Sequence, residues 1–205
     1  MPSLTQAGSV NLTYDRYKGS YGAGVFSATK NSGGAGLADS FLTFCIEYVE
    51  HIRLGVAYDY EVVPASDAPN DGWTPMGQAQ ADLLGKWFGK YYHAFGGGDF
   101  SEWTSANATL FQLGVWEIVA DTTFDLTAGV FDAVGSASAG VGPYASAAVR
   151  ADVDRLFAEV DRVNGPSLAL AAFTNNSLQD HITVVPIPAA ATALAPVLGL
   201  MYVVR

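Results

Sequence analysis

The sequence contains a single cysteine, Cys45, among 205 residues. One cysteine excludes any disulfide within the chain, so its thiol is left for burial, for pairing with another chain, or for chemistry. Positive charge is also scarce, because ten Lys and Arg residues stand against twenty Asp and Glu residues and the formal net charge is -10. That balance repels phosphate backbones and forms no basic cluster, so we expect neither nucleic acid nor an anionic membrane surface as a partner.

Several familiar motifs are missing as well. No Gly-rich phosphate loop and no zinc-ligand spacing occurs, so we expect no nucleotide cofactor and no metal. The first six residues, MPSLTQ, have neither a basic start nor an apolar run and are not a secretory signal. For an exported protein, we expect that signal to lie outside this chain.

What is present indicates a sheet-containing domain with many turns. Half of the residues are hydrophobic, which allows a sizeable core. The 22 glycines suit a domain with many turns. Strand-like segments come first, helical ones follow, and short strands return, which is typical of α+β proteins. We predict an antiparallel β-sandwich or barrel-like sheet with an inserted helical subdomain. Strands are expected at 9–14, 21–28, 41–52, 58–63, 168–173 and 181–185, and helices from Thr74-Pro75, from Thr104 or Ser105 to about 121, and over 144–163.

The last residues differ from the rest. Residues 187–204 carry no charge, and their 18 residues fall within the ~17–25 that a membrane-spanning helix needs. Pro188 and Pro196 weaken that helix, and a buried terminal segment is the alternative. We therefore predict a domain at 1–184 followed by a hydrophobic sorting or anchor tail at 185–205.

Cys45 lies in the strongest strand segment. Period-two alternation places Phe44 and Ile46 on an apolar face and Cys45 on the more polar one. A small core residue is the ordinary role of a lone cysteine.

Gln112 lies within the second expected helix, and its neighbours on the same face are apolar, among them Val115 and Trp116. Burying an unpaired amide costs about 1–3 kcal/mol in proteins, so something must compensate. One explanation is a hydrogen bond to backbone. The other is that the amide has reacted, because a thiolate is a nucleophile and a carboxamide carbon is an acyl centre. Attack by Cys45 on Gln112 would expel ammonia and leave a thioester.

The sequence contexts favour the second explanation. Phe44-Cys45-Ile46-Glu47 on a strand, followed by the helix segment Phe111–Glu117, FQLGVWE, resembles the Cys-Gln thioester domains of bacterial surface proteins. That family typically has an aromatic-Cys-aliphatic-acidic strand and a Thr-Gln-x-Ala-(Ile/Val)-Trp helix. The similarity runs from about residue 41 to 183. Here Phe111 replaces the family's Thr and Gly114 replaces its Ala, whereas Cys45, Gln112 and Trp116 remain.

The resemblance implies a covalent adhesin. Cys45 and Gln112 would form the internal thioester, and Trp116 would shield it. An amine on a surface protein or polysaccharide would attack the Gln112 carbonyl and become attached through an amide. The reaction is single-use, so we do not expect an enzyme.

The tail has a resemblance of its own. Val185-Pro186-Ile187-Pro188, a hydrophobic stretch and a terminal Arg205 are similar to the Val-Pro-x-Pro variant of PEP-CTERM sorting tails. This implies processing by an exosortase-type enzyme, contact with the membrane through the tail, and a place in the cell envelope or extracellular matrix of a Gram-negative bacterium.

Two other functions stay open. The first is a structural matrix protein whose Cys-Gln pair never reacts. The second is an exported cysteine hydrolase, which would need one of the three histidines, His51, His93 or His181, beside Cys45.

Overall fold

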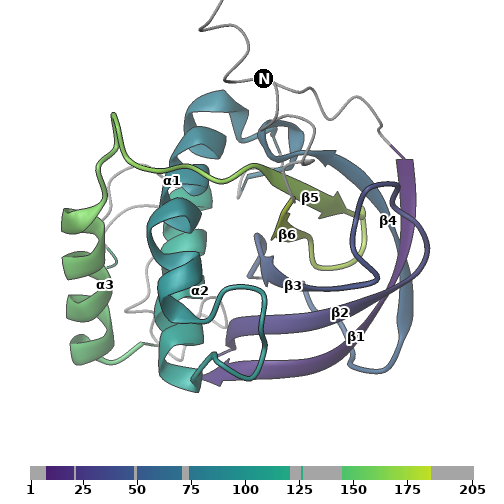
Figure 1. The fold of residues 1–205 in the computed structure, drawn as a ribbon, viewed down its shortest axis with the longest axis horizontal. Helices are drawn as coiled ribbons and strands as arrows, with labels where there is room; N and C mark the ends of the chain where they lie inside the picture. Colours follow the sequence, from purple (N-terminus) through teal and green to yellow (C-terminus); the bar gives the residue numbers. More distant parts are fainter. Residues whose placement is uncertain are drawn as a thin grey trace, which may run out of the picture.

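The computed structural model describes residues 8–20, 22–48, 50–70, 74–120, 126 and 145–185. Its strands form one closed barrel in the order β1-β2-β3-β6-β5-β4, and every neighbouring pair is antiparallel. The helices come between β4 and β5 in the sequence and gather on one side of the barrel (Figure 1). The elements are β1 (Gly8–Ser20), β2 (Ala23–Gly33), β3 (Ser40–Cys45), β4 (Ala57–Pro64), the 3₁₀ turn η1 (Ala65–Asp67), α1 (Gly77–Phe95), α2 (Ser105–Ala120), α3 (Ala147–Glu159), β5 (Leu170–Thr174) and β6 (His181–Val184).

This architecture confirms the α+β class and the barrel-like sheet with inserted helices. The predicted tail lies outside the described residues except for Val185, so the division at 184 and the sorting signal stay predictions. Among the described residues, no helix is both long and apolar enough to cross a membrane.

The barrel interior is aromatic. Tyr14 packs with its ring centroid 4.5 Å from that of His181, 5.8 Å from Phe26 and 6.1 Å from Tyr60. These residues come from β1, β2, β4 and β6, so one cluster ties most of the barrel's strands together. Because every second side chain of a strand faces inward, Thr43 and Cys45 of β3 lie on the same face.

The other face of β3 is covered by the helices. The Phe44 ring lies 4.7 Å from Phe111 and 5.4 Å from both Phe88 and Trp103. Both faces of the strand are therefore buried, and Cys45 is only 1% exposed. The prediction that Cys45 shares the more polar face with Thr43, opposite Phe44, is confirmed. That face is nevertheless buried, because period two separates the faces of a strand but does not say which of them meets water.

The strand predicted over 41–52 ends early, at Cys45. Beyond it, the Ile46 N–H still donates to the Asp180 carbonyl at 2.9 Å, and the chain then leaves the barrel. The first helix also starts later than predicted, at Gly77, because the Thr74 hydroxyl and N–H both bind the Asn70 side chain in a preceding turn.

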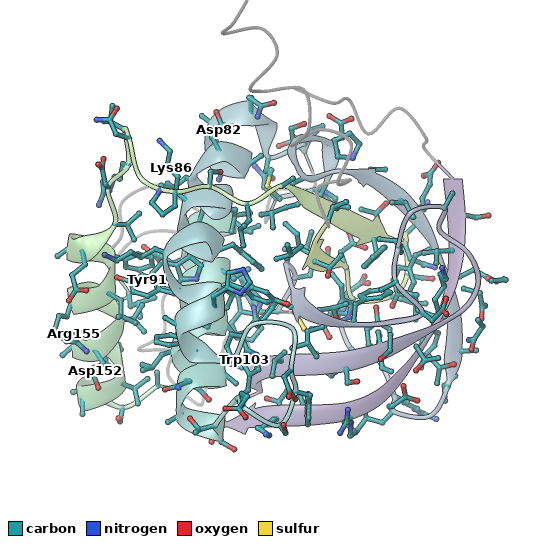
Figure 2. The ribbon with its side chains drawn as sticks, viewed as in Figure 1. Asp82, Lys86, Tyr91, Trp103, Asp152 and Arg155 are labelled. Atoms are coloured by element: carbon teal, nitrogen blue, oxygen red, sulfur yellow. The ribbon has the colours of Figure 1, made fainter. Side chains whose placement is uncertain are left out.

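Helix α2 is central to the helical layer. It packs against β1, β2 and β3 on one side and against α1 and α3 on the others. The Tyr91 hydroxyl of α1 reaches α3 and donates to the Leu156 carbonyl at 2.6 Å (Figure 2). Thr104 caps α2 as predicted, since its hydroxyl accepts the Asn107 N–H at 3.1 Å.

Contacts with other aromatic rings account for Phe111 and Gly114, the two residues near Gln112 that differ from the motif the segment resembles. Phe111 is a hub of the aromatic cluster, and its carbonyl accepts the Trp87 indole N–H at 3.2 Å. Gly114 lies under the same indole, and a Cβ built there would stand 2.6 Å from Trp87 Cε2. The glycine is therefore required by the indole that presses on α2.

We predict that Gly114→Ala destabilises the protein by about 1–2 kcal/mol, because overpacking costs about 1–3 kcal/mol and the gain in helix propensity returns only about 1. Urea unfolding measures the change. In a Trp87→Phe background, where the indole is gone, the same Gly114→Ala change should cost less. An equal cost in both backgrounds would contradict this account.

Candidate functional site

The structure brings Cys45 and Gln112 together. The Cys45 N–H donates to Gln112 Oε1 at 3.0 Å, and Gln112 Nε2 donates to the Cys45 carbonyl at 2.7 Å. Both residues are buried, and Gln112 is 0% exposed. The carboxamide is thus held, by both of its polar atoms, against the residue that carries the thiol.

The sheet register explains why the Cys45 backbone is free to bind a side chain. Cys45 faces His181 as a non-hydrogen-bonded pair, since the neighbouring Ile46 N–H takes the Asp180 carbonyl. The N–H and C=O of Cys45 therefore point away from β6, toward β2. Strand β2 pairs with β3 only as far as Val25 and Phe44, so the Gln112 carboxamide completes the ladder in its place.

A second side chain of α2 works in the same way. Thr109 lies one turn before Gln112, and its hydroxyl accepts the Ser20 N–H at 2.8 Å, at the end of β1. Residues three apart on a helix share a face. Helix α2 therefore fills the place where β2 separates from β3, with Thr109 on one strand end and Gln112 on the other.

This geometry fits both explanations of the buried amide. Backbone hydrogen bonds satisfy the carboxamide, as the simpler explanation requires. The same bonds also place an acyl centre beside the only thiol, and the burial of both residues excludes water, as thioester formation requires.

The thiol is held in its neutral form. Burial raises the pKa of the Cys45 thiol well above its usual value; the Cys45 backbone N–H opposes this and the Glu47 carboxylate adds to it. Because the thiolate is the nucleophile, a resting Cys45 is unreactive unless a neighbouring group removes its proton.

Two carboxyl groups lie close to the end of β3. Burial raises the pKa of Asp180 to about 7; a hydrogen bond from the Asn175 N–H opposes this shift, and Glu47 and Glu50 add to it. Glu47 accepts the Asp180 N–H at 3.1 Å through Oε2. The two acidic residues therefore fasten the β3 end to the start of β6.

His181 is the site residue that the sequence did not distinguish from the other two histidines. It is the Cα partner of Cys45 on β6, and it is completely buried. Its Nδ1 lies 3.2 Å from Thr43 Oγ1, and burial lowers the pKa of the ring to about 3. Only the pairing of β3 with β6 reveals this neighbour, because 136 positions separate the two residues in the sequence. His51 and His93 are exposed.

Trp116, the predicted shield, is 2% exposed. It lies one turn after Gln112, and its ring meets Tyr48 edge to face with centroids 6.2 Å apart. Tyr48 follows Cys45 by three residues, so the aromatic pair joins the same two segments as the Cys45–Gln112 pair. Within the described ranges, no group of three or more His, Cys, Asp or Glu side chains is placed to hold a metal ion.

No protein-family model matches the chain, and a comparison with curated proteins finds no match. Among solved structures, an N-terminal thioester domain of a surface protein from Clostridium perfringens is similar at 10% identity, over 86% of this chain and 97% of that one, with a TM-score of 0.45. A pilus-presented adhesin, Spy0125 (Cpa), in its P1 form, is similar at 12% identity, over 89% of this chain and 88% of that one, with a TM-score of 0.37. Both scores are below 0.5, so the fold described above rests on its own strands and helices.

The hydrogen bonds of Gln112 predict a stability effect that the helix pattern alone does not. The helix pattern alone predicts that Gln112→Ala only completes an apolar stripe. In the structure, the same change removes the hydrogen-bond partners of the buried Cys45 N–H and C=O groups. We predict that Gln112→Met, made in a Cys45→Ala background where no thioester can form, costs roughly 2 kcal/mol or more, because an unsatisfied buried group costs about 1–3 kcal/mol. Urea unfolding measures the loss, and Leu113→Met in the same background is the matched control, at under about 1.5 kcal/mol. Equal losses would show that the hydrogen bonds stabilise nothing.

The raised pKa of Asp180 predicts that the stability of the folded protein depends on pH. Its folded pKa, about 7, lies above the usual carboxyl value, so the folded state keeps the proton longer than the unfolded state. The stability that Asp180 contributes is complete below about pH 4 and is lost as pH rises through about 7. Relative to Asp180→Asn, the wild type should therefore lose on the order of 1–2 kcal/mol between about pH 5 and about pH 8. Urea unfolding at both pH values gives the difference, and Asp82→Asn, on the exposed side of α1 (Figure 2), is the control. A wild type that gains stability over this pH range relative to Asp180→Asn would contradict a raised pKa of Asp180.

Proposed function

We propose that this protein is an exported surface protein in which Cys45 and Gln112 form an internal thioester that attaches covalently to amine-bearing targets. The observation that carries the proposal is the pair of hydrogen bonds that hold the buried Gln112 carboxamide against Cys45. The resemblance of the Cys45 and Gln112 segments to those of Cys-Gln thioester domains supports it.

The chemistry needs only these two side chains. Cys45 Sγ attacks Gln112 Cδ, the Cδ–Nε2 bond breaks, and ammonia leaves. An amide resists this attack in water, but oriented intramolecular reactions reach effective molarities of about 10⁵–10⁸ M. A target amine then attacks Cδ, an amide forms, and Cys45 returns to a free thiol. Each molecule reacts once, so the protein is a ligation module and not an enzyme.

Shielding is the part of the proposal that concerns Trp116. The resting bond must survive in water, and both Cys45 and Gln112 are closed off from solvent. The edge-to-face pair of Trp116 with Tyr48 joins the two segments that carry the bond. A target amine would therefore reach Gln112 through a local opening of this pair.

Partners and location complete the proposal. The target is an amine on a surface protein or polysaccharide. An exosortase-type enzyme would process the tail, which would contact the membrane in the envelope of a Gram-negative bacterium. This last part rests on the sequence of residues 185–205 alone.

Two alternatives compete. A structural matrix protein with an unreacted pair is favoured by one observation, that each polar atom of the Gln112 amide already makes a backbone hydrogen bond. A cysteine hydrolase gains a histidine opposite Cys45. Turnover, however, needs substrate to reach the thiol repeatedly, and Cys45 is 1% and His181 0% exposed, whereas ligation needs only one opening of the site.

The intact mass of the protein and its reaction with a small amine distinguish the thioester protein from the two alternatives. Fresh protein should weigh one ammonia less than its sequence, and Cys45 should resist alkylation. Methylamine should then add at Gln112 and expose one alkylatable thiol at Cys45, because aminolysis breaks the bond that hid it. Intact mass and peptide mapping measure both changes. A full sequence mass, with no adduct in folded protein, would leave the structural alternative standing.

The variants make the test specific. Cys45→Ala removes the leaving group and Gln112→Ala removes the acyl centre, so each should abolish the adduct completely. The double variant should be no worse than either, since the residues act as one unit. An adduct that still forms in Cys45→Ala would contradict the mechanism.

A further inference from the structure

We propose that the imidazole of His181 carries the thiol proton of Cys45 to the departing nitrogen of Gln112, which makes His181 a third catalytic residue of thioester formation. The inference rests on the function proposed above and adds the proton carrier that the reaction needs.

The barrel places His181 beside the thiol. Cys45 and His181 are directly opposed on β3 and β6, so their side chains share one face of the sheet, and the His181 ring lies among the aromatic rings of the barrel interior. Cβ atoms of such a non-hydrogen-bonded pair lie about 4.5–5.5 Å apart. Sγ and Nε2 are not hydrogen-bonded in the resting protein, and side-chain rotation brings them together when the thiol attacks. Tyr14 and Phe26 pack on the ring at 4.5 and 5.4 Å and keep it in place.

The hydrogen bonds of the ring leave one nitrogen available. Nδ1 is engaged with Thr43 Oγ1 at 3.2 Å, whereas Nε2 has no hydrogen-bond partner among the described residues. A buried polar atom without a partner is costly and calls for a reason. With Nδ1–H donating to Thr43, the lone pair of Nε2 is free to accept a proton, and Thr43 is a positioning residue.

The protonation states fit a carrier. Burial lowers the pKa of His181 to about 3, so the ring is neutral and able to accept, and once protonated it is a strong acid. Burial raises the pKa of Cys45, so thiolate is scarce without a base. The other ionisable groups facing this part of the barrel are Tyr14, Tyr17, Tyr60, Glu47 and Asp180. The pKa of each tyrosine is raised by burial, so the phenols stay protonated.

The step balances with these atoms alone. Nε2 takes the proton from Sγ as Sγ bonds to Gln112 Cδ, and a tetrahedral intermediate forms. The imidazolium then gives the proton to Gln112 Nε2, the Cδ–Nε2 bond breaks, and ammonia leaves. His181 ends neutral, as it began.

A refolding experiment isolates this step. Full-length chain kept unfolded in denaturant and reductant from synthesis onward retains both the thiol and the carboxamide. Dilution starts folding, and intact mass follows the loss of one ammonia while circular dichroism follows the folded fraction. His181→Asn retains an N–H for Thr43, and His181→Phe retains the ring packing. Both should slow ammonia loss about 100-fold or more per folded molecule, the usual size of general acid–base catalysis.

The pH profile separates catalysis from mere structure. The wild-type rate should be flat from about pH 6 to about pH 9, because His181 is neutral throughout. In both variants only thiolate can attack, so the rate should rise about tenfold per pH unit. His51→Asn, on the surface, should leave the wild-type rate unchanged. Asp180→Asn and Glu47→Gln remove the other possible acceptors, and both should keep the flat profile of the wild type.

The outcomes test the role of His181 separately from the proposed function. Folded His181 variants that lose ammonia at the wild-type rate would overturn the role of His181 and leave the thioester intact. A slowdown confined to Asp180→Asn or Glu47→Gln would assign the proton to a carboxylate and also overturn it. Wild-type protein that folds and keeps its full mass would remove the proposed function, and this inference with it. If both variants fail to fold, the wild-type profile decides alone: a flat one supports His181, and a tenfold rise per unit excludes it.

Discussion

The hydrogen bonds between the Gln112 carboxamide and the Cys45 backbone are the constraint on which the rest of the site depends. A closed barrel needs partners for every backbone group along its strands, and β2 leaves β3 one residue before Cys45. Helix α2 supplies the missing partners through a side chain. The barrel's closure and the pairing of acyl centre with thiol are therefore one arrangement, and neither can change without the other.

The aromatic packing on α2 follows from that arrangement. A helix that inserts a polar side chain at a strand end must be held to the barrel closely, and the ring cluster around Phe111 and Trp87 holds it. Phe111 and Gly114 replace a threonine and an alanine of the motif that the segment resembles. Both residues contact the Trp87 indole, so they adapt the helix to that ring.

Much of the fold could be predicted from local pattern. The order of strands and helices and the cap at Thr104 both depend on neighbouring residues. The two faces of β3 could be separated by pattern, but their burial could not be predicted, because a barrel lined inside and covered outside buries polar and apolar positions alike. Cys45 and Gln112 were found through the sequence around each of them. His181 was not, because its importance comes from a strand register that no local pattern encodes.

The register of β3 with β6 also sets an order of events. β6 is the last strand of the barrel and contributes the residue directly opposite Cys45, and Asp180, which immediately precedes it, contributes the carbonyl that binds Ile46. Until that strand docks, the thiol lacks the enclosure that makes it unreactive, and the carboxamide faces an unfinished sheet. A chain still being synthesised or threaded through a membrane therefore carries an ordinary cysteine and an ordinary glutamine. Only the arrival of its C-terminal strand creates the environment that distinguishes them, so the state of this one residue pair records whether the whole domain has been completed.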